Sequence, residues 1–444
     1  LGEPPATELA KCLVELGFKL GRLKTGTSPR VDGRTIDFSK LQRHPQDEAK
    51  WHFSHRTKEF SPPKVDCWMT HTTPETHEII LKNLDRSPLY TGKITGTGVR
   101  YCPSLEDKVV KFRDKAHHQV IIEPDGLDTH EYYLNGVSTS LPEDVQIQYL
   151  RTIPGLEKVE VIRPGYGIEY DFVFPSQIYP TMETKKIENL YFAGQINGTT
   201  GYEEAAAQGI IAGINAALKL KGKPPFIPKR SESYLGVLID DLTTKEITEP
   251  YRMFTTRAEY RLILRQDNAD ERLMKYGVEF GLVSPEEYEK VLKRKERVQK
   301  KIFDLKTKKV SPEEINPILE KKRSSKIKVK TSLYDILKRP EIKYDDIKEF
   351  AGDLPDKERL QVETEIKYEG YIEKMKRDAK RMEEYENKII PDWIDYDKIQ
   401  NLSFEAREKL KKLRPMTLGQ ASRIDGVTPA DIFAILVEMK KNQR

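Results

Sequence analysis

The sequence has few cysteines, no long apolar run and no recognisable metal-binding pattern. Its three cysteines, Cys12, Cys67 and Cys102, form no Cys-x-x-Cys pair, which is typical of a protein from a reducing compartment. No apolar run approaches the ~20 residues of a membrane span, and no signal peptide is visible. The eight histidines all precede residue 131 and show no ligand spacing, which predicts that no metal is bound. We therefore expect a cytoplasmic protein with no membrane segment.

Charged residues are abundant but nearly balanced. Lys and Arg number 76 and Asp and Glu number 71, so the net charge is +5, and charged residues make up 33% of the chain. A net charge this close to zero supports nucleic-acid binding only weakly, because the location of the charge matters more than its sum. At 444 residues the chain is too long for a single core, and we expect about two to four domains.

Glycine and alanine cluster in one segment that carries the strongest functional signal. The apolar run Leu190–Ala193 predicts a strand, the glycines that follow predict a turn, and a helical pattern comes next. On that helix four small residues fall four apart: Ala205, Gly209, Gly213 and Ala217. A glycine inside a helix costs about 1 kcal/mol relative to alanine. Either a cofactor contacts the turn, with the positive helix end facing an anionic group, or the helix packs closely on a sheet.

Two long motifs resemble signatures of one known family. The segment from Ala193 to Ala216 resembles the second flavin signature of the MnmG (GidA) family, the tRNA uridine 5-carboxymethylaminomethyl modification enzymes. Gly98-Val-Arg-Tyr-Cys-Pro-Ser-Leu-Glu-Asp-Lys-Val-Val-Lys-Phe112 resembles its other signature, except that Val99 stands where the family has Pro. The resemblance continues through residues 24–30, 163–171, 249–261 and 419–429. It covers essentially the whole chain.

The resemblance implies that the protein uses both a flavin and a nicotinamide. It places the FAD contacts at Gly194, Gln195, Asn197, Gly198, Thr199 and Gly201. Among them, the amide of Gln195 can both donate and accept hydrogen bonds. It places NAD contacts at Gly98, Val99, Arg100, Tyr101, Cys102, Pro103, Ser104, Leu105, Glu106, Asp107, Lys108, Val109, Val110, Lys111 and Phe112. Only a subset can line a site, since Glu106 and Lys108 cannot share one helical face. The alternative is that this segment is a catalytic or tRNA-binding loop.

Cys102 is the candidate catalytic residue. It lies between Tyr101 and Pro103, two residues after Arg100, and a neighbouring cation favours the thiolate form. A thiolate can add to C6 of uridine and make C5 nucleophilic toward a one-carbon electrophile. The alternative is a structural thiol. We expect Cys12 and Cys67 to lie in the core.

Arginines after residue 250 and a basic loop near the N-terminus are the candidates for tRNA binding. Three of these arginines fall four apart and would form one cationic ridge on a helix, where guanidinium groups match phosphates. The alternative is that they pair with Glu249, Glu259 and Asp267. Lys-rich stretches at 293–309 and 321–330 are most simply solvated faces, although they can extend an electrostatic track. The candidate residues are Lys24, Arg30, Arg252, Arg257, Arg261 and Arg265, with Arg34 beside the first two.

The order of these patterns predicts a mixed fold, α/β and α+β. We expect a partial glutathione-reductase-like FAD domain with an inserted α+β domain, followed by an all-helical C-terminal region. The boundaries are 1–30 for a remnant of the FAD domain, 31–180 for the inserted substrate or NAD domain, 181–225 for the return to the FAD domain, 226–390 for a helical linker and tRNA-binding region, and 391–444 for a helical partner-binding module. Strands are expected at Val65–Thr70, Gln119–Glu123 and Val159–Arg163, and a helix at Thr7–Leu16.

Start signals predict the helices of the second half. Ser284-Pro285 and Ser311-Pro312 each place a capping residue, a first-turn proline and two glutamates in order. Apolar spacing from Val362 to Ile372 predicts one long helix that ends near Ile390. Signals at Thr417 and Thr428 predict a compact three-helix module at the end of the chain.

The resemblance implies modification of C5 of the wobble uridine in certain tRNAs. NADH would reduce FAD, methylene-tetrahydrofolate would supply one carbon, and an MnmE-type GTPase would join a homodimer of the enzyme in a heterotetramer. One alternative is a folate- and FAD-dependent tRNA uridine methyltransferase; another is a tRNA- or GTPase-binding scaffold without catalysis.

One expected motif is absent from the chain. Members of the family hold the FAD pyrophosphate with a Gly-x-Gly-x-x-Gly loop, and Gly96-Thr-Gly98 lacks the third glycine. We therefore expect a fragment that lacks the N-terminal part of the flavin domain and binds FAD weakly or not at all.

Overall fold

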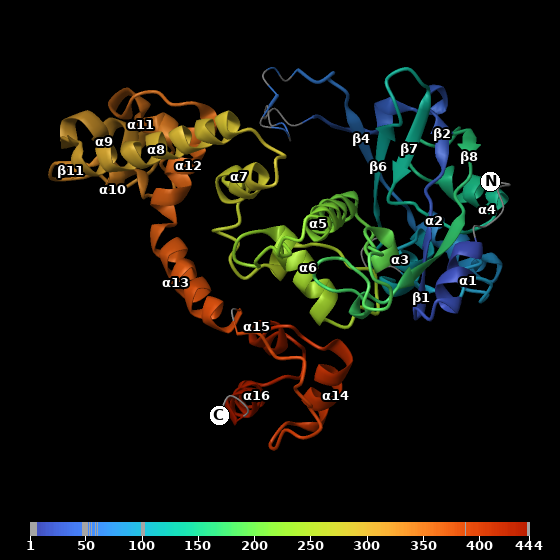
Figure 1. Cartoon of the computed structure of the whole chain (residues 1–444). Coiled ribbons are helices and arrows are strands. Elements are labelled where there is room, and N and C mark those ends of the chain that lie inside the picture. The colour runs from blue at the N-terminus through green and yellow to red at the C-terminus, as the bar shows by residue number, and fades with distance from the viewer. Residues whose placement is uncertain are drawn as a thin grey trace. The chain divides into compact units, whose positions relative to one another are not determined.

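The computed structural model describes residues 7–46, 52, 54, 56, 57, 59, 61–98, 103–386 and 388–441 (Figure 1). The chain divides into two compact units. The first contains Leu1–Phe174, Gln195–Thr200 and Ile247–Arg252; the second contains Pro175–Gly194, Gly201–Glu246 and Met253–Arg444. The first unit is mixed α/β and the second is largely helical, as the sequence predicts.

A six-stranded antiparallel sheet forms the centre of the first unit. Its strand order is β3-β4-β6-β7-β2-β8. The expected strands near residues 65, 119 and 159 are confirmed as β4, β6 and β8. The strands are β2 (Arg30–Asp32), β3 (Gln42–His44), β4 (Cys67–His71), β6 (Gln119–Pro124), β7 (Glu131–Asn135) and β8 (Val161–Arg163).

Helices complete the core of this unit. They are α1 (Glu8–Glu15), α2 (Pro74–Lys82), α3 (Leu105–Lys111) and α4 (Glu143–Leu150). Helix α2 begins at a capping box in which Thr73 and Thr76 satisfy each other's backbone, with Pro74 in the first turn. Ile80, Val109 and Val145 are buried in one apolar cluster with Val120 and Leu134 of the sheet, so α2, α3 and α4 all contribute to its core.

A second, three-stranded sheet in the first unit leads into the glycine turn. It contains β1 (Leu20–Gly26), β5 (Thr97–Gly98) and β9 (Gly167–Val173) in the order β5-β1-β9. Strand β5 is parallel to β1, and β9 is antiparallel to it with Gly21 opposite Phe172. A Cβ at Gly21 would lie 2.5 Å from the Phe172 ring, so glycine is required for the strands to pair.

The second unit holds twelve of the described helices and one small strand pair. The helices are α5 (Tyr202–Leu220), α6 (Tyr234–Thr244), α7 (Ala269–Glu279), α8 (Pro285–Thr307), α9 (Pro312–Lys321), α10 (Leu333–Leu337), α11 (Tyr344–Ala351), α12 (Asp356–Lys367), α13 (Glu369–Glu386), α14 (Phe404–Leu413), α15 (Leu418–Ser422) and α16 (Pro429–Lys441). Strands β10 (Lys309–Val310) and β11 (Thr331–Ser332) pair antiparallel. Both Ser-Pro helix starts are confirmed, each with a capping box.

Two separate apolar cores stabilise the C-terminal half. One runs from Val298 to Ile366 and belongs to α8–α12. The other runs from Ile390 to Met439 and belongs to α14–α16. The expected three-helix terminal module is therefore confirmed, with Thr417 capping α15. Figure 1 shows α13 in the stretch of chain that connects the two groups of helices.

Three local predictions are wrong. Leu190–Ala193 is not a strand: Tyr191 makes one isolated bridge with Glu183, and Asn189, directly before the segment, has a positive φ. The long helix expected through Tyr368 breaks there into α12 and α13, just before Gly370, a residue that weakens helices. Cys12 is exposed rather than buried, because it lies on the solvent face of α1.

Within the described part of the chain, no helix combines the length and apolarity that a bilayer crossing needs.

Candidate functional site

The glycine turn that the sequence singles out has a backbone that only glycine adopts easily. Gly194 has φ +90° and Gly198 has φ +75°, both in the left-handed region. The 3-10 turn η5 (Gln195–Asn197) lies between them. Asn197 at its end and the following Thr199 are almost fully buried. The carbonyl of Gly198 accepts a hydrogen bond from the backbone N–H of Tyr251 at 2.8 Å.

Gln195 is the exposed residue at the tip of this turn. Its side chain lies near the hydroxyl of Tyr170 on β9, which is buried and makes no hydrogen bond with a described residue; burial raises the pKa of Tyr170. The turn therefore presents an amide to solvent next to a neutral phenol. Both groups can donate and accept hydrogen bonds, as the carbonyl and ring nitrogens of a flavin require.

The start of α5 differs from the sequence-based expectation. The carboxylate of Glu204, in the first turn of α5, lies against Gly201, where an added Cβ would come within 1.7 Å of Oε2. Its Oε1 also accepts a hydrogen bond from the backbone N–H of Met253 at 2.7 Å. The expectation that this positive helix end offers its space to an anionic cofactor group is therefore wrong, because a carboxylate of the chain is already there. Packing of Glu204 also explains why residue 201 is glycine.

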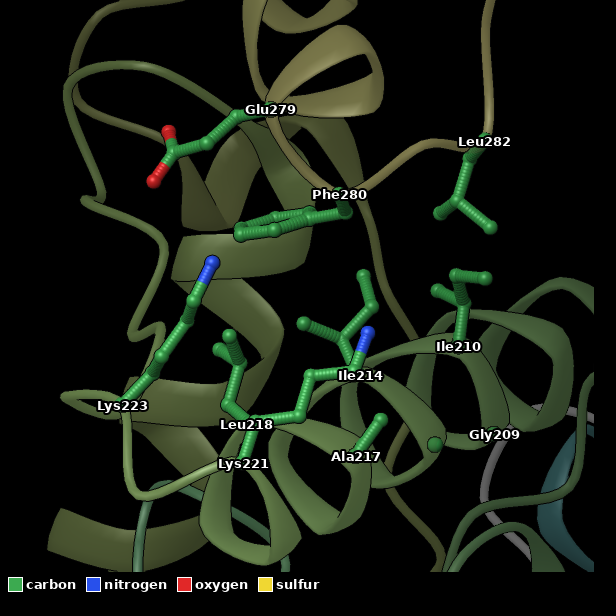
Figure 2. A pocket seen from close by; sticks show the side chains of 11 residues that line it. Gly209, Ile210, Ile214, Ala217, Leu218, Lys221, Lys223, Glu279, Phe280 and Leu282 are labelled. Carbon is green, nitrogen blue, oxygen red and sulfur yellow. The ribbon is translucent and has the colours of Figure 1, made fainter.

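The small-residue face of α5 is open. Within the described residues, no atom lies within 4 Å of a Cβ built at Gly209 or Gly213, apart from the neighbours and helix backbone beside each glycine. This face borders a groove of about 310 Å³. Figure 2 shows Ile210, Ile214 and Leu218 on α5 facing Phe280 and Leu282, with Lys221, Lys223 and Glu279 at the rim. Among the described residues, Gly209 and Gly213 therefore do not pack closely against a sheet.

The Gly98–Phe112 segment, which resembles the family's other signature, folds in part into α3. Val99, Arg100, Tyr101 and Cys102 lie outside the described residues. Ser104 caps α3 by accepting a hydrogen bond from the backbone N–H of Asp107 at 3.2 Å. Ser104, Leu105, Glu106 and Val109 are buried, so four of the predicted NAD contacts are covered by the protein. Pro103, Asp107, Lys108, Val110, Lys111 and Phe112 are the described residues of the segment that remain as candidates, with Gly98 on β5.

Glu106 is the buried anchor of this segment. Its side chain has no exposed area. Its Oε1 accepts hydrogen bonds from the backbone N–H of Ser140 at 2.9 Å, the Ser140 hydroxyl at 3.0 Å and the Ser87 hydroxyl at 3.3 Å. Lys108 instead donates to the carbonyl of Gly136 at 2.8 Å, which confirms that Glu106 and Lys108 point to different surroundings.

A histidine pair near α3 was not predicted from the sequence. The rings of His77 and His118 lie 5.1 Å apart, and His118 is 9% exposed. Burial lowers the pKa of His118 to about 4, helped by His77, Lys108 and Lys115. The described residues contain no group of three or more His, Cys, Asp or Glu side chains placed to hold a metal ion. The adjacent His117-His118 in the sequence is the signal that could have drawn attention to this cluster.

The arginines predicted to form one helical ridge do not lie on a helix. After the 3-10 turn η6 (Thr255–Arg257), the chain forms turns until α7 begins. Arg265 pairs with Asp267 at 3.1 Å and Glu365 at 2.8 Å, so the structural alternative holds for this residue. Arg261 is exposed and makes no ion pair with any described residue.

The basic residues of the first unit are also engaged within the protein. Lys24 donates to the carbonyl of Leu89 at 3.1 Å, and Arg30 donates to that of Ser28 at 2.9 Å. Arg34 forms a forked ion pair with Asp32, which lowers the pKa of that carboxyl to about 2. Arg252 is half-buried. All six candidates for tRNA contact stay predictions: Lys24, Arg30 and Arg252 belong to the first unit, and Arg257, Arg261 and Arg265 belong to the second.

A buried ionic cluster in the second unit was not predicted from the sequence. Arg230 is 8% exposed and donates to Asp240 at 3.1 Å, Asp241 at 2.7 Å and Glu259 at 2.7 Å. Burial lowers the pKa of Arg230, but the carboxylates of Asp240 and Asp241 outweigh it and raise the pKa above its ordinary value. Arg423 completes the cluster through Asp240. The signal for it, Asp240-Asp241 inside an apolar helix, is visible in the sequence only with hindsight.

Comparison with known families agrees with this architecture. Residues 1–224 match the model of the family described as glucose inhibited division protein A. Residues 285–376 match the C-terminal helical domain, and residues 378–444 the C-terminal helical bundle, of the tRNA modifying enzyme MnmG/GidA. The chain belongs to the MnmG/GidA family.

Similar proteins span nearly all of the chain. A protein of Thermodesulfovibrio yellowstonii named tRNA uridine 5-carboxymethylaminomethyl modification enzyme MnmG is 56% identical, with 99% of this chain and 71% of that protein covered. The protein of that name from Geobacillus thermodenitrificans is 51% identical with the same coverage. The solved structure of Aquifex aeolicus GidA in its form II crystal is 49% identical with a TM-score of 0.86, and covers 99% of this chain and 70% of that one.

Proposed function

We propose that this chain takes part in the flavin-dependent modification of C5 of the wobble uridine in certain tRNAs, in which a carboxymethylaminomethyl or aminomethyl group is added. Relatives that are 51–56% identical over 99% of the chain carry the name of that activity. The structural observation that carries the flavin assignment is the turn at Gly194–Gly198, which holds a left-handed backbone and presents Gln195. FAD, once bound and reduced by NADH, would supply the flavin chemistry that handles the one-carbon unit of methylene-tetrahydrofolate.

The described residues fit part of an FAD site. The exposed Gln195 amide suits the polar edge of an isoalloxazine ring, and the hydroxyl of Tyr170 is a buried polar group without a hydrogen-bond partner among the described residues. The start of α5 does not suit a phosphate, because Glu204 lies there. We therefore assign Gly194, Gln195, Asn197, Gly198 and Thr199 to contact with the flavin ring or ribityl chain, and we assign Gly201 to packing.

Cys102 is the proposed nucleophile. Its thiolate would add to C6 of uridine, so that C5 attacks the one-carbon electrophile; loss of the C5 proton and departure of the thiolate would then restore the ring. Gly98 and the remaining exposed residues of the Gly98–Phe112 segment are proposed to contact NADH. We propose an MnmE-type GTPase as partner, with residues 391–444 as its docking module, in a heterotetramer built on a homodimer.

Nucleoside mass spectrometry tests the reaction. Undermodified tRNA would be incubated with the chain, FAD, NADH, methylene-tetrahydrofolate, an amine donor and the GTPase. The proposal expects an aminomethyl-type group on the wobble uridine. A product of 5-methyluridine would instead support the folate-dependent methyltransferase. Binding of tRNA without any product would support a scaffold.

Substitution of Cys102 shows whether its thiol acts as the nucleophile or has only a structural role. Cys102→Ser is expected to reduce the modification rate at least about 100-fold, because a hydroxyl is a far weaker nucleophile than a thiolate at neutral pH. The matched control is Cys12→Ser, at an exposed position of α1, which should retain full activity. Full activity of Cys102→Ser would remove this role.

A further inference from the structure

One loop of the α8–α12 domain carries positive charge only. Residues 321–330 contain six cations and no acidic residue: Lys321, Lys322, Arg323, Lys326, Lys328 and Lys330. The loop begins at the end of α9 and runs into β11, whose pairing with β10 places Lys309 opposite Ser332. We call residues 321–330 together with Lys309 the basic loop surface. Figure 1 shows β11 beside α9 and α10.

The backbone of this loop is fixed from beneath. Asn316 on α9 accepts a hydrogen bond from the Ile327 N–H at 2.9 Å and donates to the Ile327 carbonyl at 3.1 Å. Arg339 donates to the Ser324 hydroxyl at 2.9 Å and also to the carbonyl of Ser325. Ile327 itself is 8% exposed and belongs to the core of the α8–α12 domain. The loop therefore holds its charges at defined positions and needs little ordering on binding.

Most of these cations are available to a partner. Lys322 pairs with Asp346 at 2.8 Å and Lys326 with Glu320 at 2.5 Å. The other five cations of the basic loop surface are exposed and make no ion pair with any residue that the structure describes: Lys309, Lys321, Arg323, Lys328 and Lys330. Val329 is the one large apolar side chain exposed in residues 321–330, at 72%. The surface therefore offers charge but almost no apolar area.

Helix α13 shows what an ordinary charged surface of this protein looks like. Its residues 369–386 contain five cations, Lys374, Lys376, Arg377, Lys380 and Arg381. They also contain six acidic residues, Glu369, Glu373, Asp378, Glu383, Glu384 and Glu386. Cations interleaved with anions give no net attraction for a polyanion, whereas a run without anions does.

We propose that the basic loop surface binds the phosphate backbone of the tRNA substrate. This inference rests on the proposed function and adds a contact surface to the six tRNA candidate residues, in a stretch that the sequence alone indicates most simply as a solvated face. Closely spaced cations without an apolar centre suit a repeating polyanion, because binding to phosphates releases counterions and needs no hydrophobic core. An acidic protein would require an apolar centre for a stable interface, and Val329 alone does not provide one.

Matched triple variants of the full chain test the proposal by tRNA binding across a range of salt concentrations. The test variant is Lys309→Gln, Lys328→Gln and Lys330→Gln. The control is Lys374→Gln, Lys376→Gln and Lys380→Gln on α13, which removes the same charge from exposed positions that make no ion pair with described residues. A third variant, with arginine at 309, 328 and 330, keeps the charge.

The expected result is a loss of at least about tenfold in tRNA affinity for the test variant. The slope of log affinity against log salt should fall by about two, since each phosphate contact contributes roughly 0.7–0.9. The control should stay within about twofold of the parent, and the arginine variant should bind like the parent. Equal losses in both glutamine variants, or no loss in the test variant, would overturn the inference and leave the proposed function standing. A parent chain that fails to bind tRNA would overturn both; tRNA binding without modification would overturn the proposed function alone.

Discussion

Arg423 donates hydrogen bonds to both carboxylate oxygens of Asp240, from Nε to Oδ2 at 2.7 Å and from Nη2 to Oδ1 at 2.6 Å. Asp240 lies on α6, and Arg423 is the residue that ends α15. Their side chains are 9% and 14% exposed. The forked pair therefore connects the C-terminal bundle to α6 in a site with little water.

Removal of one partner from this pair should be costly. We expect Arg423→Gln to lower the free energy of unfolding by about 3–5 kcal/mol, since it leaves a buried carboxylate short of a partner. Urea unfolding followed by circular dichroism measures this. Lys441→Gln, which breaks the exposed pair with Glu438 at 3.0 Å, should cost less than about 1 kcal/mol. Similar costs for the two variants would show that the Asp240 site is solvated.

His118 makes stability depend on pH. Its pKa in the folded protein is about 4, below the ordinary value of 6.5, so the unfolded chain takes up a proton that the folded chain does not. Stability should be complete above about pH 6.5 and fall as the pH drops toward 4, with a slope of at most about 1.4 kcal/mol per pH unit from this residue. The pKa of His77 is also lowered, by burial and by His117, and acts in the same direction.

Urea midpoints between pH 4.5 and 7 measure this slope. His118→Phe should flatten it, because a phenyl ring fills the same space and does not titrate. The same substitution at the exposed His71 should leave the slope unchanged. An unaltered slope in His118→Phe would assign the pH dependence to other groups.

Gly201→Ala tests the position of Glu204. The backbone of Gly201 has φ −93°, which any residue adopts, so the cost comes only from the Cβ that would meet Oε2 at 1.7 Å. Displacement of the carboxylate leaves the N–H of Met253 without its acceptor, at a cost of about 1–3 kcal/mol. In a Glu204→Ala background, Gly201→Ala should cost almost nothing. A double-mutant cycle from thermal unfolding measures the coupling, and additive effects would contradict this packing.

Glu106→Ala should destabilise the first unit more than Glu106→Gln. Alanine removes the oxygen that accepts hydrogen bonds from the Ser140 N–H, the Ser140 hydroxyl and the Ser87 hydroxyl. Glutamine keeps one acceptor oxygen. We expect a loss of several kcal/mol for alanine, since each buried unsatisfied group costs about 1–3 kcal/mol. Hydrogen exchange at the Ser140 amide reports the local effect. Equal exchange rates in both variants would show that Glu106 does not hold this loop.

Local signals predicted helices and strands well, but not where side chains go. Ser284 and Ser311 start helices because a cap and a first-turn proline act within four residues. The break at Tyr368 lies just before Gly370, and Tyr191 forms a bridge with the nearby Glu183; the spacing of apolar residues alone contains neither feature. The same holds for the tRNA candidates: a four-residue spacing from Arg257 to Arg265 indicates a ridge only if the segment is helical, and Glu365 lies a hundred residues away.

At the candidate flavin site, too, local backbone features could be predicted from the sequence but side-chain positions could not. The turn predicted at Gly194 and Gly198 is confirmed, because glycine is the residue that adopts positive φ at little cost. The reason for Gly201 was not predicted, since it depends on how the side chain of Glu204 folds back. The division into five domains and the assignment of individual cofactor and tRNA contacts stay predictions.

The terminal bundle, residues 390–439, forms its apolar core from its own side chains alone. Charged contacts with the rest of the unit, such as Lys412 with Glu246 at 2.6 Å, do not require matched shapes in the way that interlocking apolar surfaces do. Bundles from relatives should therefore be exchangeable in chimeras, provided that a guanidinium at 423 meets a carboxylate at 240. The sequence of this end of the chain can then vary without changes in the rest of the unit.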